Sequence, residues 1–119
     1  MKSVISNSVR SKCPEIDRLV QSVDICSGKL LRPLVLILSA HMLGSIKKQH
    51  YTAAAVVELI HNATLLHDDV LDDAAKRRHR STINVLHGNE SAVLLGDLLL
   101  TRVFNLILQL PENVQNEIA

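Results

Sequence analysis

The chain has 119 residues, of which 47% are hydrophobic, so it can bury the core of one small domain and nothing indicates a second. A formal net charge of +1 and only two aromatic residues, Tyr51 and Phe104, argue against nucleic acid as a partner. The two cysteines form no CxxC pair, the first ten residues lack a signal-peptide core, and no apolar run reaches the ~20 residues of a transmembrane segment. We therefore expect a soluble, cytoplasmic protein.

The predicted elements of the first half are helices. Pro14 suits a first helical turn, and apolar residues follow at helical spacing up to Val23. A second helix should be entered near Pro33 and stop at Gly44, where glycine favours a left-handed cap. The longest helix is expected over residues 51–71, because this stretch is rich in alanine and leucine and contains no proline or glycine.

The second half also lacks any strand-like alternation. Residues 73–81 are charged and aperiodic, which predicts a loop, and a short helix should close at Gly88. The next helix should have Asn89 or Ser91 as its cap and end before Pro111, after which another helix begins. The predicted fold class is therefore all-α.

The segment LLHDDVLDDAAKRRHR, residues 65–80, gathers charge of both signs in a nearly neutral chain. At 100° per residue, Asp68 and Asp72 share a helix face with His61, and Asp69 lies on a neighbouring stripe. Such carboxylates repel one another by a few tenths of a kcal/mol per pair, which a cation would reverse. Oxygen ligands favour a hard ion such as Mg²⁺, which takes one or two protein carboxylates and completes its shell with water and phosphate. A solvated acidic helix end is the alternative interpretation.

Two basic clusters accompany the acidic helix end. Arg77 and Arg78 are adjacent and point in different directions, so each can hold a different anionic group. In GKLLRP, Lys29 and Arg32 stand at a helix start, where a phosphate also gains from unpaired backbone N–H groups. The carboxylates end a long apolar run, which places them at the rim of an apolar cavity. These features together indicate two diphosphates with apolar tails as ligands.

The motifs GKLLRP, ELIHNATLLHDDVLDD, KRR and AVLLGDLLLTRVF, in this order and spacing, resemble the amino-terminal part of the trans-type polyprenyl diphosphate synthases. The resemblance runs from about Gly28 to Leu108. It implies the amino-terminal portion of the isoprenoid synthase helical bundle, with residues 1–119 as part of a single domain. It also implies a prenyltransferase that needs Mg²⁺ and condenses isopentenyl diphosphate with an allylic prenyl diphosphate.

The resemblance assigns roles to individual residues. Asp68 and Asp72 would bind Mg²⁺, supported by Asp69, and with Arg77 they would hold and ionise the allylic diphosphate as the catalytic residues. Isopentenyl diphosphate would be held by Lys29, Arg32, His61 and Arg78.

The resemblance also bears on product length and on the loop after the arginines. Short-chain members of the family carry a bulky aromatic residue four or five positions before the acidic motif, where this chain has the small Ala63 and Thr64. A medium- or long-chain product, such as hexa- to octaprenyl diphosphate, is therefore implied. His79 stands where the family has a glycine. We expect His67 to be oriented by a neighbouring carboxylate and Gly96 to serve close helix packing.

The second acidic motif of the family is missing, so we expect this chain alone to be catalytically incomplete. The apolar faces that further helices would cover predict association, as a homodimer or hetero-oligomer. Two other interpretations stay open. One is a non-catalytic helical subunit of a two-component prenyl synthase. The other is an HD-type metal phosphohydrolase built on His61 and the doublet His67–Asp68, although it accounts for neither Asp72 nor GKLLRP.

Overall fold

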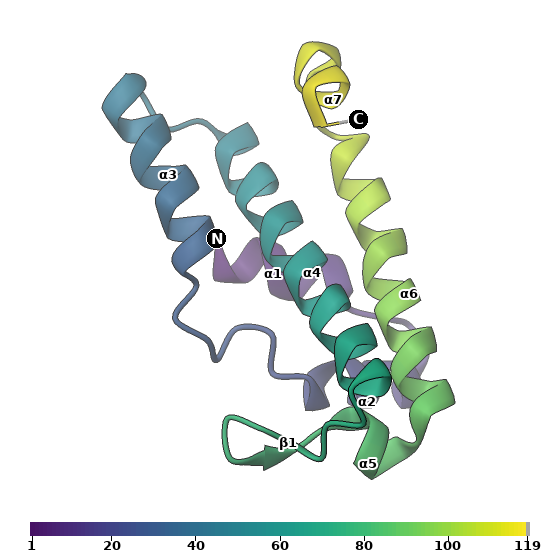
Figure 1. The fold of residues 1–119 in the computed structure, drawn as a ribbon. Helices are drawn as coiled ribbons and strands as arrows, with labels where there is room; N and C mark the ends of the chain where they lie inside the picture. The colour runs from purple at the N-terminus through teal and green to yellow at the C-terminus, as the bar shows by residue number, and fades with distance from the viewer. Residues whose placement is uncertain (119) are drawn as a thin grey trace.

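The structure is a computed structural model that describes residues 1–118, and within them it contains seven helices and one short β-hairpin (Figure 1). The fold class is therefore all-α, as predicted. The elements in chain order are α1 (Lys2–Val9), α2 (Pro14–Ser22), α3 (Leu31–Leu43), α4 (Lys48–Leu71), β1 (Lys76–Arg77), β2 (Arg80–Ser81), α5 (Ile83–His87), α6 (Asn89–Ile107) and α7 (Glu112–Ile118).

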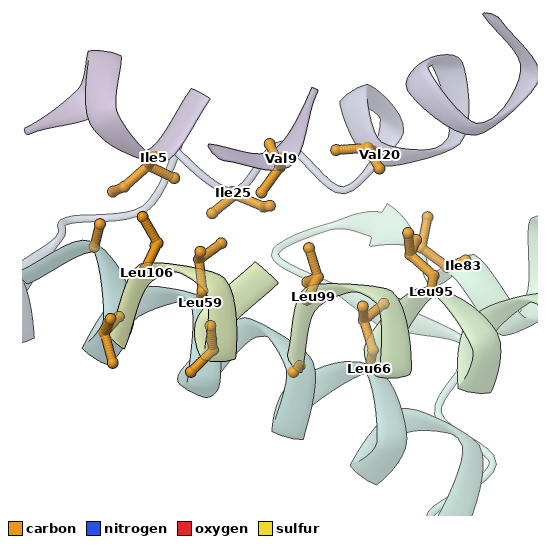
Figure 2. Packing of buried hydrophobic residues seen from close by; sticks show 14 of the residues in the cluster. Ile5, Val9, Val20, Ile25, Leu59, Leu66, Ile83, Leu95, Leu99 and Leu106 are labelled. Atoms are coloured by element: carbon orange, nitrogen blue, oxygen red, sulfur yellow. The ribbon is translucent and has the colours of Figure 1, made fainter. Parts of the chain in front are cut away.

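Helices α4 and α6 run antiparallel through the centre of the fold, and α3 flanks α4 (Figure 1). On the other side, α1 and α2 lay their apolar residues over α4 and α6, so that Ile5, Val9 and Val20 face the leucines of the central pair (Figure 2). Leu59 of α4 and Leu99 of α6 are fully buried in this cluster. The core therefore fixes α4, whose final turn carries the acidic residues.

The helices predicted from proline, glycine and apolar spacing are present. The long helix over residues 51–71 is α4, which begins at Lys48. Helix α3 ends before Gly44 as predicted, but Gly44 has φ 153° and ψ −139°, so the predicted left-handed cap is wrong. The helix is closed instead by a 3₁₀-type hydrogen bond from the Gly44 N–H to the His41 carbonyl (3.3 Å).

Two further predictions at helix ends need correction. The cap of α6 is Gly88, and neither Asn89 nor Ser91 caps it, because Gly88 (φ +88°) ends α5 and begins α6 with no residue between them. Helix α1 was not predicted, because Ile5 and Val9 are the only buried residues of its eight and this pattern is too short to read.

The loop predicted over residues 73–81 contains an antiparallel hairpin, in which Lys76 pairs with Ser81 and Arg77 pairs with Arg80. The two turn residues, Arg78 (φ +50°) and His79 (φ +64°), both have positive φ, as a type I′ turn requires. The hairpin was not predicted from the sequence because its strands have two residues each and its turn lacks the usual Asn-Gly pair.

Large apolar side chains remain exposed on the outer faces of the bundle. The most exposed on α3 and α6 are Leu31, Val35, Met42, Leu43, Leu94 and Phe104. None of the helices within residues 1–118 combines the length and the hydropathy that crossing a membrane requires. The expected apolar faces are thus present, and association through them stays a prediction.

Candidate functional site

The acidic motif lies at the carboxyl end of α4, which closes in a Schellman motif. The Ala74 N–H donates to the Asp69 carbonyl (2.9 Å) and the Asp73 N–H donates to the Val70 carbonyl (3.3 Å). Asp73 occupies the left-handed position (φ +50°) that glycine usually takes. Asp73 therefore shapes the turn, while the exposed Asp68 and Asp72 lie one helical turn apart before it.

The carboxylates at this helix end oppose the stability of α4. The carboxyl end of a helix carries the negative end of its dipole, so each nearby carboxylate costs about 0.3–1 kcal/mol. Among residues 1–118, no three His, Cys, Asp or Glu side chains converge closely enough to form a complete metal site. Asp68 and Asp72 are thus two exposed carboxylates at the end of α4, and their role as metal ligands stays a prediction.

Asp69 has a different role from its neighbours because its side chain is 8% exposed. The Arg77 guanidinium reaches back from β1 and donates to it as a fork, with Nη2 at 2.6 Å and Nε at 3.1 Å from Oδ1. This hydrogen bond to Asp69 raises the pKa of Arg77 above its usual value. Arg77 is therefore held as a fixed cation beside the acidic motif, with its remaining N–H donors free to receive an anion.

Arg78, the next residue, lies against Gly28. A Cβ on Gly28 would stand 2.9 Å from both Nη1 and Nη2 of Arg78, so only glycine leaves room for this guanidinium. The contact brings Arg78 to the GKLLRP segment, which the sequence placed 50 residues away. The two adjacent arginines therefore contact different neighbours, although both line the same cleft.

The GKLLRP segment forms the start of α3. Leu30 is its N-cap, in the left-handed region (φ +49°), and no described side chain caps the helix. The first N–H groups of α3 are therefore left for an anion, and the exposed Lys29 and Arg32 stand on either side of Leu30 and Leu31.

His61 of α4 lies among these cations. Burial lowers the pKa of His61 below its usual value, and the positive charges of Arg32, Arg78 and Arg77 lower it further against an opposing effect of Glu58. The imidazole is therefore neutral at neutral pH and can hydrogen-bond to an anion without adding charge. Arg32, Arg77 and Arg78 thus lie close enough to His61 for their charges to act on it.

A cleft of about 570 Å³ opens beside the fork, between α4, the hairpin, α5 and the segment that precedes Gly28. Arginine side chains and Asp69 line its rim, and Leu65, Leu66, Ile83 and Leu86 line its apolar part. An ion pair between Arg80 and Asp24 (3.1 Å) joins the hairpin to the segment before α3 across this cleft. Asp24 and Arg80 were not predicted as site residues, because no local pattern links positions 56 residues apart.

The two residues implied in product length have different surroundings. Ala63 has no exposed surface and belongs to the buried apolar cluster, whereas Thr64 is exposed on the neighbouring face of α4. Their role in product length stays a prediction. Of the two residues, Thr64 is the one that lies on the same face of α4 as Asp68, one helical turn before it.

His67 faces α6 rather than the exposed carboxylates. Its Nε2 lies 3.1 Å from the Val93 carbonyl and 3.4 Å from Oδ1 of Asp97. The ring packs directly over Gly96, which leaves no room for a Cβ. The prediction that a carboxylate orients His67 is confirmed, with Asp97 as that carboxylate. The prediction that Gly96 serves close helix packing is confirmed as well. His67 therefore points away from a shared metal site with Asp68, and the HD-type interpretation has no support in this geometry.

Comparison with known proteins defines first the class and then the family. The fold is that of isoprenoid synthases: residues of this chain superpose on a polyprenyl synthase from Caulobacter crescentus, described as complexed with calcium and isoprenyl diphosphate, with a TM-score of 0.84 and 35% identity. That match covers 91% of this chain and 33% of the other. The polyprenyl synthetase family model matches residues 14–118. The chain belongs to the polyprenyl synthetase family.

Two curated relatives agree with this membership. The octaprenyl diphosphate synthase of Escherichia coli is 37% identical over 110 residues, which cover 92% of this chain and 34% of the relative. The geranylgeranyl diphosphate synthase of Saccharolobus solfataricus is 39% identical over 100 residues, which cover 84% of this chain and 30% of the relative. The chain thus spans about a third of the length of these relatives.

Proposed function

We propose that this chain carries part of the active site of a prenyltransferase that condenses isopentenyl diphosphate with an allylic prenyl diphosphate in the presence of Mg²⁺. One observation carries the proposal: the hairpin sends Arg77 to the acidic end of α4 and Arg78 to Gly28. Two guanidinium groups that line one cleft but contact different neighbours suit a reaction between two diphosphates.

The metal would bind at Asp68 and Asp72. Their carboxylates are exposed and one helical turn apart, and among residues 1–118 no cysteine or histidine joins them in a cluster of three, which suits the oxygen preference of Mg²⁺. When bound, the ion would supply positive charge to the leaving diphosphate. The Caulobacter crescentus relative, whose description names calcium and isoprenyl diphosphate, supports this assignment.

Arg77 would hold the allylic diphosphate in an orientation set by Asp69. Breaking the allylic C–O bond leaves negative charge on the diphosphate, and a cation that is already in position stabilises this charge without reorganising. Asp69 accepts hydrogen bonds from Nε and Nη2 of Arg77. These bonds fix the guanidinium plane, so the N–H groups that do not face Asp69 point in a fixed direction.

Isopentenyl diphosphate would bind where Arg78, Lys29 and Arg32 meet neutral His61. Its double bond attacks the allylic cation, a new C–C bond forms, and loss of a proton gives a prenyl diphosphate one C5 unit longer. The apolar residues of the cleft and of α4 would keep water from the cation. The small side chain of Thr64 supports a medium- or long-chain product.

We further infer that the chain does not turn over substrate by itself. It spans about a third of the length of its relatives, and the resemblance calls for a second acidic motif that residues 1–119 lack. The exposed apolar faces of α3 and α6 favour assembly with further helices, whether from another copy of this chain or from another subunit.

Binding of inorganic pyrophosphate, measured by isothermal titration calorimetry with Mg²⁺ present, tests the proposal without requiring turnover. Arg78→Ala should lose about 1.5–3 kcal/mol, the range for a hydrogen bond to a charged group. Arg18→Ala removes the same charge from the exposed face of α2 and should bind like the wild-type chain. Equal affinities for the two variants would refute the assignment of Arg78.

A further inference from the structure

The turn that joins the acidic motif to the hairpin is held by the start of α5. Oγ1 of Thr82 donates to the Ala74 carbonyl (2.6 Å), and Nδ2 of Asn84 donates to the same oxygen (3.0 Å). The Thr82 N–H also donates to the Ala75 carbonyl (3.1 Å). Thr82 is 4% exposed, so this group of bonds, which we call the Ala74 clamp, is largely shielded from water.

The Ala74 clamp extends to the last turn of α4. Nδ2 of Asn84 lies 3.4 Å from the Asp69 carbonyl, which also accepts the Ala74 N–H. Carbonyl groups at the end of a helix have no partners within the helix, so side-chain donors decide how firmly that end is held. Asn84 thus contacts the backbone at both Asp69 and Ala74.

The orientation of Asn84 is fixed by its surroundings. Its Nδ2 must face the two carbonyl oxygens, because exchange of the amide oxygen and nitrogen would set oxygen against oxygen. Its Oδ1 is consequently buried without a hydrogen-bond partner among residues 1–118. An apolar side chain at this position would fill the space without burying an unsatisfied oxygen. The two hydrogen bonds that Nδ2 donates therefore explain why position 84 carries an amide.

The Ala74 clamp lies between the groups that the proposed reaction uses. Ala74 follows Asp72 and precedes Arg77, and the chain must fold back over eight residues for Arg77 to reach Asp69. Asp73 at the middle of this return is in the left-handed region, which is less favourable for a residue with a side chain. Bonds from α5 to Ala74 therefore oppose relaxation of the turn and separation of Arg77 from the acidic motif.

We propose that Thr82 and Asn84 are positioning residues that act through Ala74 to keep Asp69, Asp72 and Arg77 in the arrangement that binds Mg²⁺ and diphosphate. This inference rests on the proposed function, because it assigns a purpose to the geometry of that site. Neither residue belongs to the acidic motif or to the basic clusters, and both would act through their hydrogen bonds to the Ala74 carbonyl.

The affinity of the chain for inorganic pyrophosphate with Mg²⁺ present tests this inference when it is measured together with the melting temperature. Thr82→Val keeps the shape of the side chain and removes the donor, so affinity should fall about tenfold, as for other outer partners of metal sites. Thr82→Ser keeps the donor and should restore most of the affinity. Ile5→Val weakens a core contact of α1 outside the cleft and should lower the melting temperature while it leaves affinity unchanged.

The outcomes separate this inference from the proposed function. Unchanged affinity in Thr82→Val, beside normal binding by the wild-type chain, would overturn the inference alone. Failure of the wild-type chain to bind pyrophosphate with Mg²⁺ would overturn both. If Thr82→Val does not fold, Asn84→Ala tests the same clamp with the Thr82 bond in place; a smaller loss of affinity supports the inference and no loss overturns it.

Discussion

Gly28→Ala should separate anion binding from stability, because the added methyl group meets only the end of a flexible side chain. The new Cβ would lie 2.9 Å from Nη1 and Nη2 of Arg78, about half an ångström short of ordinary contact, which begins at 3.4 Å. The guanidinium must move, while the backbone of the segment before α3 can stay. Replacement of glycine by alanine also lowers the conformational entropy of the unfolded chain, which stabilises the folded protein by about 0.4–1 kcal/mol and offsets the cost of moving the guanidinium. The melting temperature should therefore change little.

The effect of Gly28→Ala on binding should be much larger. A hydrogen bond to a charged group contributes about 1.5–3 kcal/mol, and misalignment that removes about half of it costs roughly four- to twelvefold in affinity. Calorimetry with inorganic pyrophosphate and Mg²⁺ measures this change. In the Arg78→Ala background the same substitution should have no further effect, because the displaced group is gone. A full additional loss in the double variant, or wild-type affinity in Gly28→Ala, would refute the argument that Gly28 acts by admitting Arg78.

The remaining predictions concern other positions of the site. His79→Gly should raise the free energy of unfolding by about 1 kcal/mol, because His79 adopts a left-handed conformation that glycine takes without strain; chemical denaturation checks this, and a destabilised variant would contradict it. The lowered pKa of His61 should rise when pyrophosphate binds, because the anion offsets the neighbouring positive charges; NMR titration of the imidazole with and without ligand would contradict this if both curves coincide. Ala63→Phe should destabilise the chain by about 1–3 kcal/mol through overpacking, whereas Thr64→Phe should be tolerated; equal melting temperatures for the two variants would count against their different burial.

The helices could be predicted because their signals are local. Proline at the start of α2 and α3, glycine at the ends of α3 and α5, and the unbroken apolar run of α4 each act within a few residues. The cap of α6 could not be predicted in this way, because it depends on Gly88 serving two helices at once.

The family of the chain could be predicted from the sequence more fully than the geometry of the candidate site. The order and spacing of the acidic and basic motifs indicate the polyprenyl synthetase family, and the resemblance assigns roles to their residues that stay predictions. The different contacts of Arg77 and Arg78 depend on a two-residue turn that reverses the chain, and this turn lacks the usual sequence signal. The space that Gly28 leaves for Arg78 and the Ala74 clamp are likewise tertiary contacts, which residue spacing does not encode.

The central claim is that the acidic end of α4 and Arg77 together bind a metal and a diphosphate. Thermal unfolding of the chain with Mg²⁺, with pyrophosphate and with both together tests this claim directly. The stabilisation by both ligands should exceed the sum of the separate effects, because each fills coordination positions that the other leaves open. Asp68→Ala should abolish this excess, while Glu117→Ala on the exposed face of α7 should retain it. Additive effects in the wild-type chain, or an equal excess in Asp68→Ala, would contradict the claim.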